Sequence, residues 1–172
     1  VSPLIYFGKV LGRLDLLERA VAAARASVVL INHPRHITNN IYRYPNIYPI
    51  GLGPENIDHE GVPQSAMRTH AGWGEGSGVY TALAELLRNL GGMYINPQKN
   101  IILGVDGIKI KRVSVSNREI DVEIESFLSS KYLKQPWSDA YNTNVLIEDS
   151  NGWVVNVNGV TIKKTNEIIL VN

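Results

Sequence analysis

A glycine-rich stretch that leads directly into a helical segment constrains the fold of this chain more than any other feature. Glycine stands at positions 72, 74, 76 and 78. The residues from about Ser77 to Leu90 are good helix formers, and Gly91-Gly92 after them is a typical helix stop. Glycine permits close backbone approach, and the first turn of a helix carries unpaired N–H groups at the positive end of its dipole. The stretch therefore predicts a helix whose start binds an anion such as phosphate or carboxylate.

Two short apolar runs on either side of a second helical segment predict a β-α-β unit at the start of the chain. The runs are Leu4–Phe7 and Ser27–Ile31, and the segment Leu14–Ala26 lies between them. This unit has the length of a right-handed crossover between parallel strands. Met93–Ile95 adds a third expected parallel strand. We therefore expect an α/β fold with a Rossmann-like three-layer core and a short, mostly parallel sheet.

The second half of the chain predicts mostly antiparallel β structure. We expect Ile101–Leu103 and Ile108–Val115 to form a hairpin. We expect a helix over Asn117–Tyr132. A C-terminal antiparallel meander is expected of Val145–Glu148, Trp153–Val157, Val160–Lys164 and Glu167–Val171. Its Asn158-Gly159 turn requires a positive φ at both positions. The predicted domains are an α/β core over residues 1–135, which holds the glycine-rich ligand loop, and the meander over residues 136–172, packed on that core.

The composition excludes several classes of function. The chain has 172 residues, a formal net charge of +1 and only 19% charged residues, so broad nucleic-acid binding is not expected. The absence of cysteine excludes disulfides and zinc–thiolate sites. No apolar run has the length of a membrane span, and no signal peptide is visible after Val1. A soluble protein is therefore expected, with the cytoplasm favoured as its location.

The predicted ligand site combines the glycine-rich loop with neighbouring polar side chains. Its ligand-binding residues are Arg68, Trp73, Gly74, Gly76, Ser77, Gly78 and Thr81. The backbone N–H groups hold the anion, the two hydroxyls add hydrogen bonds, the indole stacks on a base or sugar, and the guanidinium pairs with the anion. The spacing matches neither the dinucleotide fingerprint nor the phosphate loop. The alternative is a close-packed turn in which Gly76 or Ser77 caps the helix.

The candidate catalytic residues are His33, His36, His70 and Glu75. A histidine titrates near neutral pH and suits general acid–base chemistry. His33 and His36 follow the second expected strand, where α/β sheets place their ligands. A mononuclear metal centre built from imidazole and carboxylate groups is an alternative, as are hydrogen-bonded surface histidines.

The hypothesis that joins these features is a small-molecule enzyme of the transferase or hydrolase type. It acts on a nucleotide, nucleoside or nucleotide-sugar held by residues 72–81 and the loop 32–70, and the sequence assigns no cofactor. One alternative is a virion or surface-filament subunit without catalysis, since sixteen asparagines and few charges suit neutral contacts. A metal-dependent hydrolase is the second alternative. Self-association through an open strand edge of the tail is expected, although Lys163, Lys164 and Glu167 could instead keep such an edge soluble.

Overall fold

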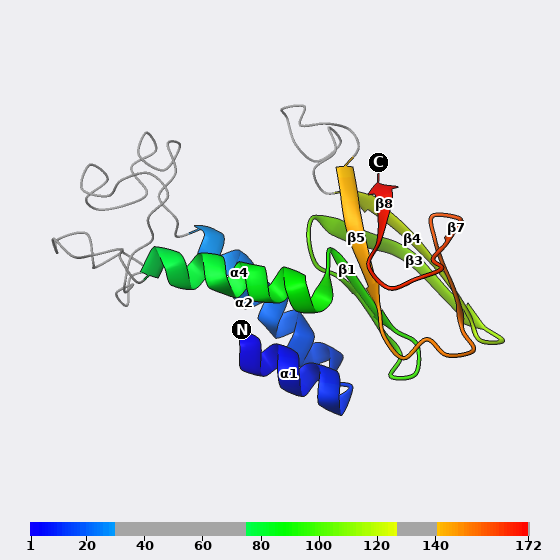
Figure 1. Cartoon of the computed structure of the whole chain (residues 1–172), viewed down its shortest axis with the longest axis horizontal. Coiled ribbons are helices and arrows are strands. Elements are labelled where there is room, and N and C mark those ends of the chain that lie inside the picture. Colours follow the sequence, from blue (N-terminus) through cyan, green and yellow to red (C-terminus); the bar gives the residue numbers. More distant parts are fainter. Residues whose placement is uncertain (30–74, 127–140, 172) are drawn as a thin grey trace, which may run out of the picture. The chain divides into compact units, whose positions relative to one another are not determined.

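The computed structural model describes residues 1–29, 75–126 and 141–171 (Figure 1). The helices are α1 (Ser2–Leu11), α2 (Leu14–Val29) and α4 (Glu75–Leu90). The strands are β1 (Met93–Asn96), β2 (Ile101–Gly104), β3 (Ile108–Ser116), β4 (Glu119–Ser126), β5 (Tyr141–Ile147), β6 (Val154–Val157), β7 (Val160–Thr161) and β8 (Glu167–Val171). The chain divides into two compact units: Val1–Leu4 with Arg19–Leu86, and Ile5–Glu18 with Leu87–Asn172. The predicted boundary at residue 136 lies outside the described residues and stays a prediction.

The first segment is a helix, so the strand predicted over Leu4–Phe7 is wrong. Helix α1 buries Ile5 and Gly8 and ends at Leu11, and Gly12 after it has a φ of 65°. Its apolar residues occupy more than one side of the helix, because Tyr6, Phe7, Val10 and Leu11 are all exposed. A short apolar run has no periodicity that separates a strand from a helix of this kind.

The helix predicted over Leu14–Ala26 is confirmed as α2, but α2 continues to Val29. Ser27–Val29 is therefore helical, and the second predicted strand is wrong over these residues; residues 30 and 31 lie outside the described ranges. Inside α2 the fully buried residues Leu17, Ala20 and Ala24 recur at helical spacing. The β-α-β opening is thus replaced by two consecutive helices.

The glycine-rich helix is confirmed as α4, which begins at Glu75 rather than near Ser77. It ends where expected, since Gly91 has a φ of 63° and its N–H donates to the carbonyl of Leu87 at 2.8 Å. A Cβ at Gly91 would lie 2.7 Å from the carbonyl oxygen of Asn144. Glycine at position 91 therefore has two effects: it ends α4, and it allows the backbone after the helix to pack closely against β5.

Two open four-stranded sheets carry the same pattern of strand directions (Figure 1). The strand order is β2-β1-β5-β8 in the first sheet and β3-β4-β6-β7 in the second. The central pairs, β1 with β5 and β4 with β6, are parallel, whereas the four outer pairs are antiparallel. Met93–Ile95 is confirmed as a strand with a parallel neighbour, but the sheet around it is mixed. The described residues form a mixed α/β fold without a Rossmann-like parallel core.

The two sheets share one hydrophobic core, and two further predictions about these strands are wrong. The core is built from Met93, Ile95, Ile108, Ile120, Val122, Ile124, Val145, Ile147, Val155, Val157, Ile162, Ile169 and Val171. The helix predicted over Asn117–Tyr132 is wrong through Ser126, because β4 alternates buried and exposed residues. The strands predicted over Ile101–Leu103 and Ile108–Val115 exist, but they belong to different sheets and form no hairpin.

The tail forms strands at the expected places without forming one meander. Strands β5 and β8 join the first sheet, and β6 and β7 join the second. The β6–β7 turn is confirmed, since Asn158 and Gly159 have φ values of 49° and 77°. Local turn chemistry is therefore predicted correctly, while the assignment of strands to sheets is not. None of the helices described here combines the length and apolar character needed to cross a bilayer.

Candidate functional site

The predicted site residues fall into two groups. His33, His36, Arg68, His70, Trp73 and Gly74 lie outside the described residues. Glu75, Gly76, Ser77, Gly78 and Thr81 lie in the first two turns of α4. Their roles in binding and catalysis stay predictions.

The start of α4 carries the backbone N–H groups on which the predicted anion site depends. Residues Glu75–Gly78 are the first four of the helix, and the N–H groups of this turn have no partner inside the helix. They also lie at the positive end of a helix of 16 residues. Gly76 and Gly78 belong to this turn rather than to the loop before it, and Thr81 is exposed one turn further on.

A second polar cluster was not predicted from the sequence. It lies at the carboxyl ends of the parallel pair β1–β5, and its members are Lys9, Tyr94, Asn96, Lys99, Glu148 and Asp149. The ammonium group of Lys9 pairs with the carboxylate of Glu148 at 2.5 Å and donates to the carbonyl of Asn89 in the last turn of α4 at 3.2 Å. It also lies 5.2 Å from the centre of the Tyr94 ring. Lys9 thus joins α1 to α4, β1 and the end of β5.

Tyr94 is the most perturbed acid of this cluster. Its side chain is fully buried, and its hydroxyl donates to Oε2 of Glu148 at 2.8 Å. Burial raises the pKa of Tyr94 well above its ordinary value, and the hydrogen bond to the Glu148 carboxylate raises this pKa further, against a lowering by Asn96. The phenol therefore stays protonated and acts as a hydrogen-bond donor.

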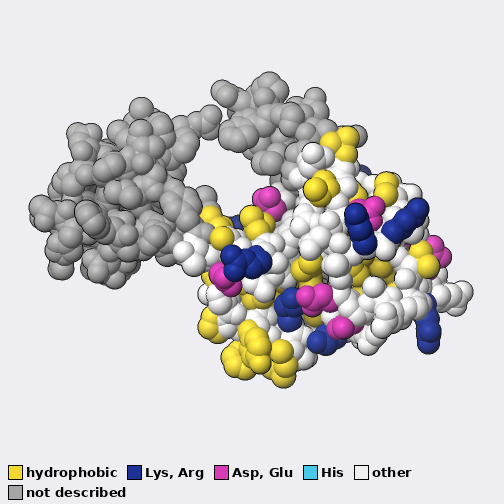
Figure 2. Space-filling model, in the orientation of Figure 1, with side chains coloured by type: hydrophobic (Ala, Val, Ile, Leu, Met, Phe, Trp, Pro, Cys, Tyr) yellow, Lys and Arg dark blue, Asp and Glu magenta, His cyan; other side chains and the backbone are white. Residues whose placement is uncertain are grey.

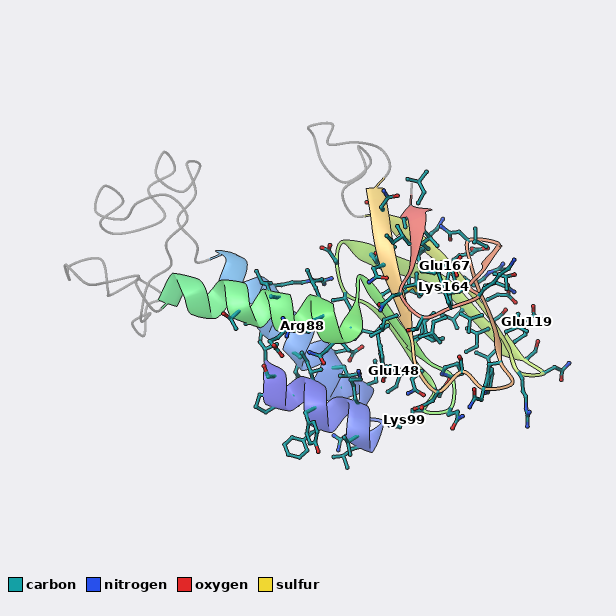
Figure 3. The ribbon with its side chains drawn as sticks, viewed as in Figure 1. Arg88, Lys99, Glu119, Glu148, Lys164 and Glu167 are labelled. Carbon is teal, nitrogen blue, oxygen red and sulfur yellow. The ribbon has the colours of Figure 1, made fainter. Side chains whose placement is uncertain are left out.

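Asn96 and Lys99 complete the cluster beside this phenol. The Asn96 amide donates to Asp149 at 2.8 Å and accepts from the N–H of Lys99 at 3.1 Å. The ammonium group of Lys99 donates to the carbonyl of Lys9 at 2.5 Å, near the end of α1 (Figure 3). A perturbed tyrosine among charged groups is a common mark of a functional site. Here each of these groups bonds to another member of the cluster or to a helix end. The arrangement therefore supports a structural role, in which the cluster holds the ends of α1 and α4 against β1 and the end of β5.

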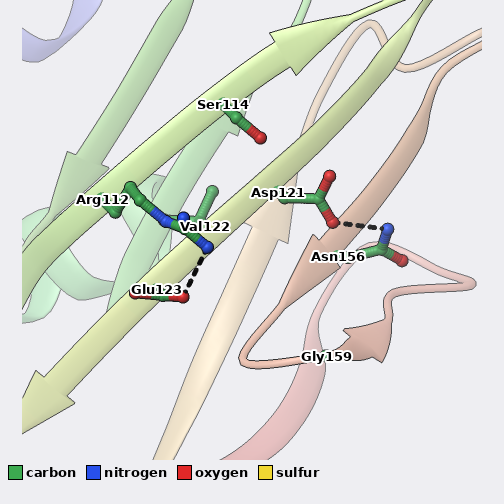
Figure 4. A pocket seen from close by; sticks show the side chains of 7 residues that line it. All are labelled: Arg112, Ser114, Asp121, Val122, Glu123, Asn156 and Gly159. Atoms are coloured by element: carbon green, nitrogen blue, oxygen red, sulfur yellow. Dashed lines mark hydrogen bonds and ion pairs between the residues drawn. The ribbon is translucent and has the colours of Figure 1, made fainter.

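A polar cleft of about 270 Å³ lies on the outer face of the second sheet (Figure 4). It is lined by Arg112, Ser114, Asp121, Val122, Glu123, Asn156 and Gly159. Arg112 pairs with Glu123 at 2.7 Å, and the Asn156 amide donates to Asp121 and to Glu119, each at 2.9 Å. The cross-strand register places Arg112, Glu123, Asp121 and Asn156 on the face opposite the core. The lining of the cleft is polar and holds two carboxylates, Asp121 and Glu123, against one guanidinium group, Arg112.

A metal centre finds no support among the residues that are described. No group of three histidine, cysteine, aspartate or glutamate side chains is placed to hold an ion within them. The four histidines of the chain all lie in the 30–74 range, outside the described residues. The metal-dependent hydrolase therefore stays an untested alternative.

Comparison with known proteins adds no family or function. The chain matches no protein-family model, no curated protein and no solved structure.

Proposed function

We propose that this chain binds the phosphate or carboxylate group of a small molecule at the start of α4 and acts on a nucleotide, nucleoside or nucleotide-sugar. The observation that carries the proposal is the position of Glu75–Gly78 in the first turn of a long helix. Two of these four residues are glycines, so a ligand can approach the N–H groups of the turn without meeting a side chain at those positions.

Glu75 fits a chemical role better than a binding role. A carboxylate in the first turn opposes a bound anion, yet it suits a base that acts on the sugar or on a water molecule. In this proposal the histidines at 33, 36 and 70 supply acid–base groups, and Arg68 pairs with the anion. The reaction is transfer or hydrolysis at a glycosidic or phosphate bond.

The mixed sheet topology removes one of the arguments that the ligand is a nucleotide. The Rossmann-like core would have placed several strand ends beside the glycine-rich loop, and that argument is lost with the two helices found in its place. What remains is anion recognition by the first turn of α4. The nucleotide class therefore rests on the loop composition, with Trp73 as the stacking residue for a base or sugar.

Calorimetric titration with a panel of nucleotides and nucleotide-sugars tests the binding step, with Gly76→Val as the disruptive variant. Valine has a slightly better helix propensity than glycine, so the folded state should survive, while the new side chain blocks the turn. We expect at least a tenfold loss of affinity, on the order of 1.4 kcal/mol. Ala84→Val, at an exposed position of the same helix, is the control and should bind normally. Equal affinities for Gly76→Val and the unsubstituted chain would exclude the site.

Glu75→Gln separates binding from chemistry. Removal of the negative charge should raise the affinity for an anion by a few fold, because a like charge leaves the first turn. The same substitution should nearly abolish turnover if the carboxylate is the base. Parallel losses of affinity and turnover would contradict the role proposed for this residue.

An assembly subunit is the second candidate, and the surface of α1 favours it. Tyr6, Phe7, Val10 and Leu11 are exposed on this helix (Figure 2), and contiguous apolar surface of this kind commonly marks an interaction site. Size-exclusion chromatography with electron microscopy distinguishes the two candidates. Filaments or shells favour the assembly subunit, whereas small discrete particles that bind nucleotides favour the enzyme.

A further inference from the structure

The described sheets have four edge strands, and three of them carry features that discourage pairing with another chain. Strand β7 has two residues, which is too short to template a partner. Strand β3 has a β-bulge between Ile110 and Arg112 and carries Lys109 and Lys111. Strand β2 has four residues and is followed directly by β3 through the turn 105–107. Short strands, bulges and edge lysines are the usual protections of a sheet edge.

Strand β8 lacks these protections. It has five residues and pairs with β5 on one side in a regular antiparallel register. Ile169 and Val171 point into the shared core, whereas Ile168 and Leu170 are 68% and 61% exposed. No residue from Ile168 to Val171 is charged. Lys163 and Lys164 precede the strand, and the carboxylate of Glu167 accepts a hydrogen bond from the N–H of Lys163 at 2.8 Å.

We propose that β8 pairs in antiparallel fashion with β8 of a second copy of this chain, about a twofold axis at Ile169. In this register Ile168 of each copy lies opposite Leu170 of the other. The two symmetric pairs bring four exposed apolar side chains into contact. The charge pattern of the strand fits a second copy, because the carboxylate of Glu167 faces Val171 rather than another carboxylate. The sheet β2-β1-β5-β8 of one copy and the same sheet of the other copy then form one continuous sheet of eight strands.

The number of residues in the β8–β8 interface indicates how stable the dimer is. A stable interface takes roughly 20–30 residues from each side, whereas β8 offers five. The dimer is therefore weak and dependent on concentration. It is independent of the anion site proposed at α4, since no residue is shared.

Sedimentation velocity of the full chain over a wide concentration range tests the pairing and its register. Ile168→Lys combined with Leu170→Lys places ammonium groups opposite each other and should weaken association by at least tenfold. Ile168→Lys combined with Leu170→Glu places an ammonium opposite a carboxylate in this register and should restore most of the association. Point substitutions are needed because deletion of residues 144–172 removes strands from both sheets.

Val154→Lys is the matched control, since Val154 is exposed on β6, which is paired on both sides. This variant should associate like the unsubstituted chain, and circular dichroism should show that all variants are folded. A chain that stays monomeric at every concentration would overturn the proposal. So would association that survives the double lysine substitution, because another surface, such as the apolar residues of α1, would then be the contact. Failure of the lysine–glutamate pair to restore association would overturn the register.

Discussion

The two sheets of this protein have the same pattern of strand directions but very different surroundings. In the first sheet all four residues of β1 are buried, so both faces of this strand are covered. In the second sheet β4 alternates buried and exposed residues, and its outer face carries Glu119, Asp121 and Glu123. A polar side chain buried on both faces depends on a partner within the protein. Tyr94 and Asn96 have such partners, whereas Oγ1 of the buried Thr143 on β5 has none among the described residues. Side chains on the outer face of β4 can use water instead.

Glycine substitutions should show the largest difference between the two sheets. A Cβ at Gly92, just before β1, would lie 2.0 Å from Oγ1 of the buried Thr143. Gly92→Ala should therefore lower the free energy of unfolding by about 3 kcal/mol, the upper range for overpacking. At Gly159, in the β6–β7 turn, a Cβ would meet nothing within 4 Å. Gly159→Ala should cost only about 1 kcal/mol, from its positive φ. Urea denaturation of both variants measures the contrast, and equal losses would contradict it.

Removal of an ion pair beside the first sheet and of one on the second sheet should give a smaller contrast in stability. The side chains of Lys9 and Glu148 are 21% and 38% exposed, against 72% and 51% for Arg112 and Glu123. Glu148→Gln should destabilise the protein by about 1–2 kcal/mol, because a largely covered ammonium group loses its counter-charge. Glu123→Gln should change stability by less than about 0.5 kcal/mol. The same denaturation experiment at low and high salt provides the test. A loss for Glu123→Gln as large as that for Glu148→Gln would show that burial does not set the difference.

Tyr94→Phe should have a modest effect at neutral pH, a loss of about 1 kcal/mol for one hydrogen bond. The effect should change with pH, because the pKa of Tyr94 is raised in the folded state. Below pH 10 the phenol is protonated in both states and its contribution is complete. Above about pH 10 the unfolded chain ionises while the folded chain does not, so this contribution falls by about 1.4 kcal/mol per pH unit.

The free energies of unfolding of the two proteins should therefore converge above pH 10 and then cross. The other seven tyrosines are common to both, so the difference isolates Tyr94. A constant difference from pH 8 to pH 11 would show that the phenol is not perturbed.

Sequence reasoning succeeded where local chemistry decides the structure. Helices α2 and α4 were predicted from helix-forming residues and from the Gly91 stop, and the Asn158-Gly159 turn was predicted from its residue pair. The helix predicted over Asn117–Tyr132 begins in a segment where Ile120, Val122 and Ile124 alternate with acidic residues. That alternation was the available signal for a strand. The pairing of strands across two sheets depends on distant segments, and no local pattern encodes it.

The polar cluster at the carboxyl ends of β1 and β5 is a second feature that depends on distant segments of the chain. Lys9 and Glu148 are separated by 139 positions, so their proximity could not be predicted without the fold. One signal was present, since Glu148-Asp149 directly follows an apolar run in the sequence, and polar residues at such strand ends often converge. The predicted anion site, in contrast, was a local feature, and the helix it needs is confirmed.

The parallel central pairs also govern the order in which this chain can fold during synthesis. Strands β1 and β4 each gain an antiparallel neighbour nearby in the sequence, but their parallel neighbours β5 and β6 follow only after residue 140. A nascent chain therefore carries two unfinished sheets whose inner strands have bare edges, a state that is prone to aggregate. Non-local pairing of this kind also slows folding. Both sheets are completed only by the strands after residue 140, in about the last fifth of the chain, so the bare edges of the inner strands are covered late and at nearly the same time.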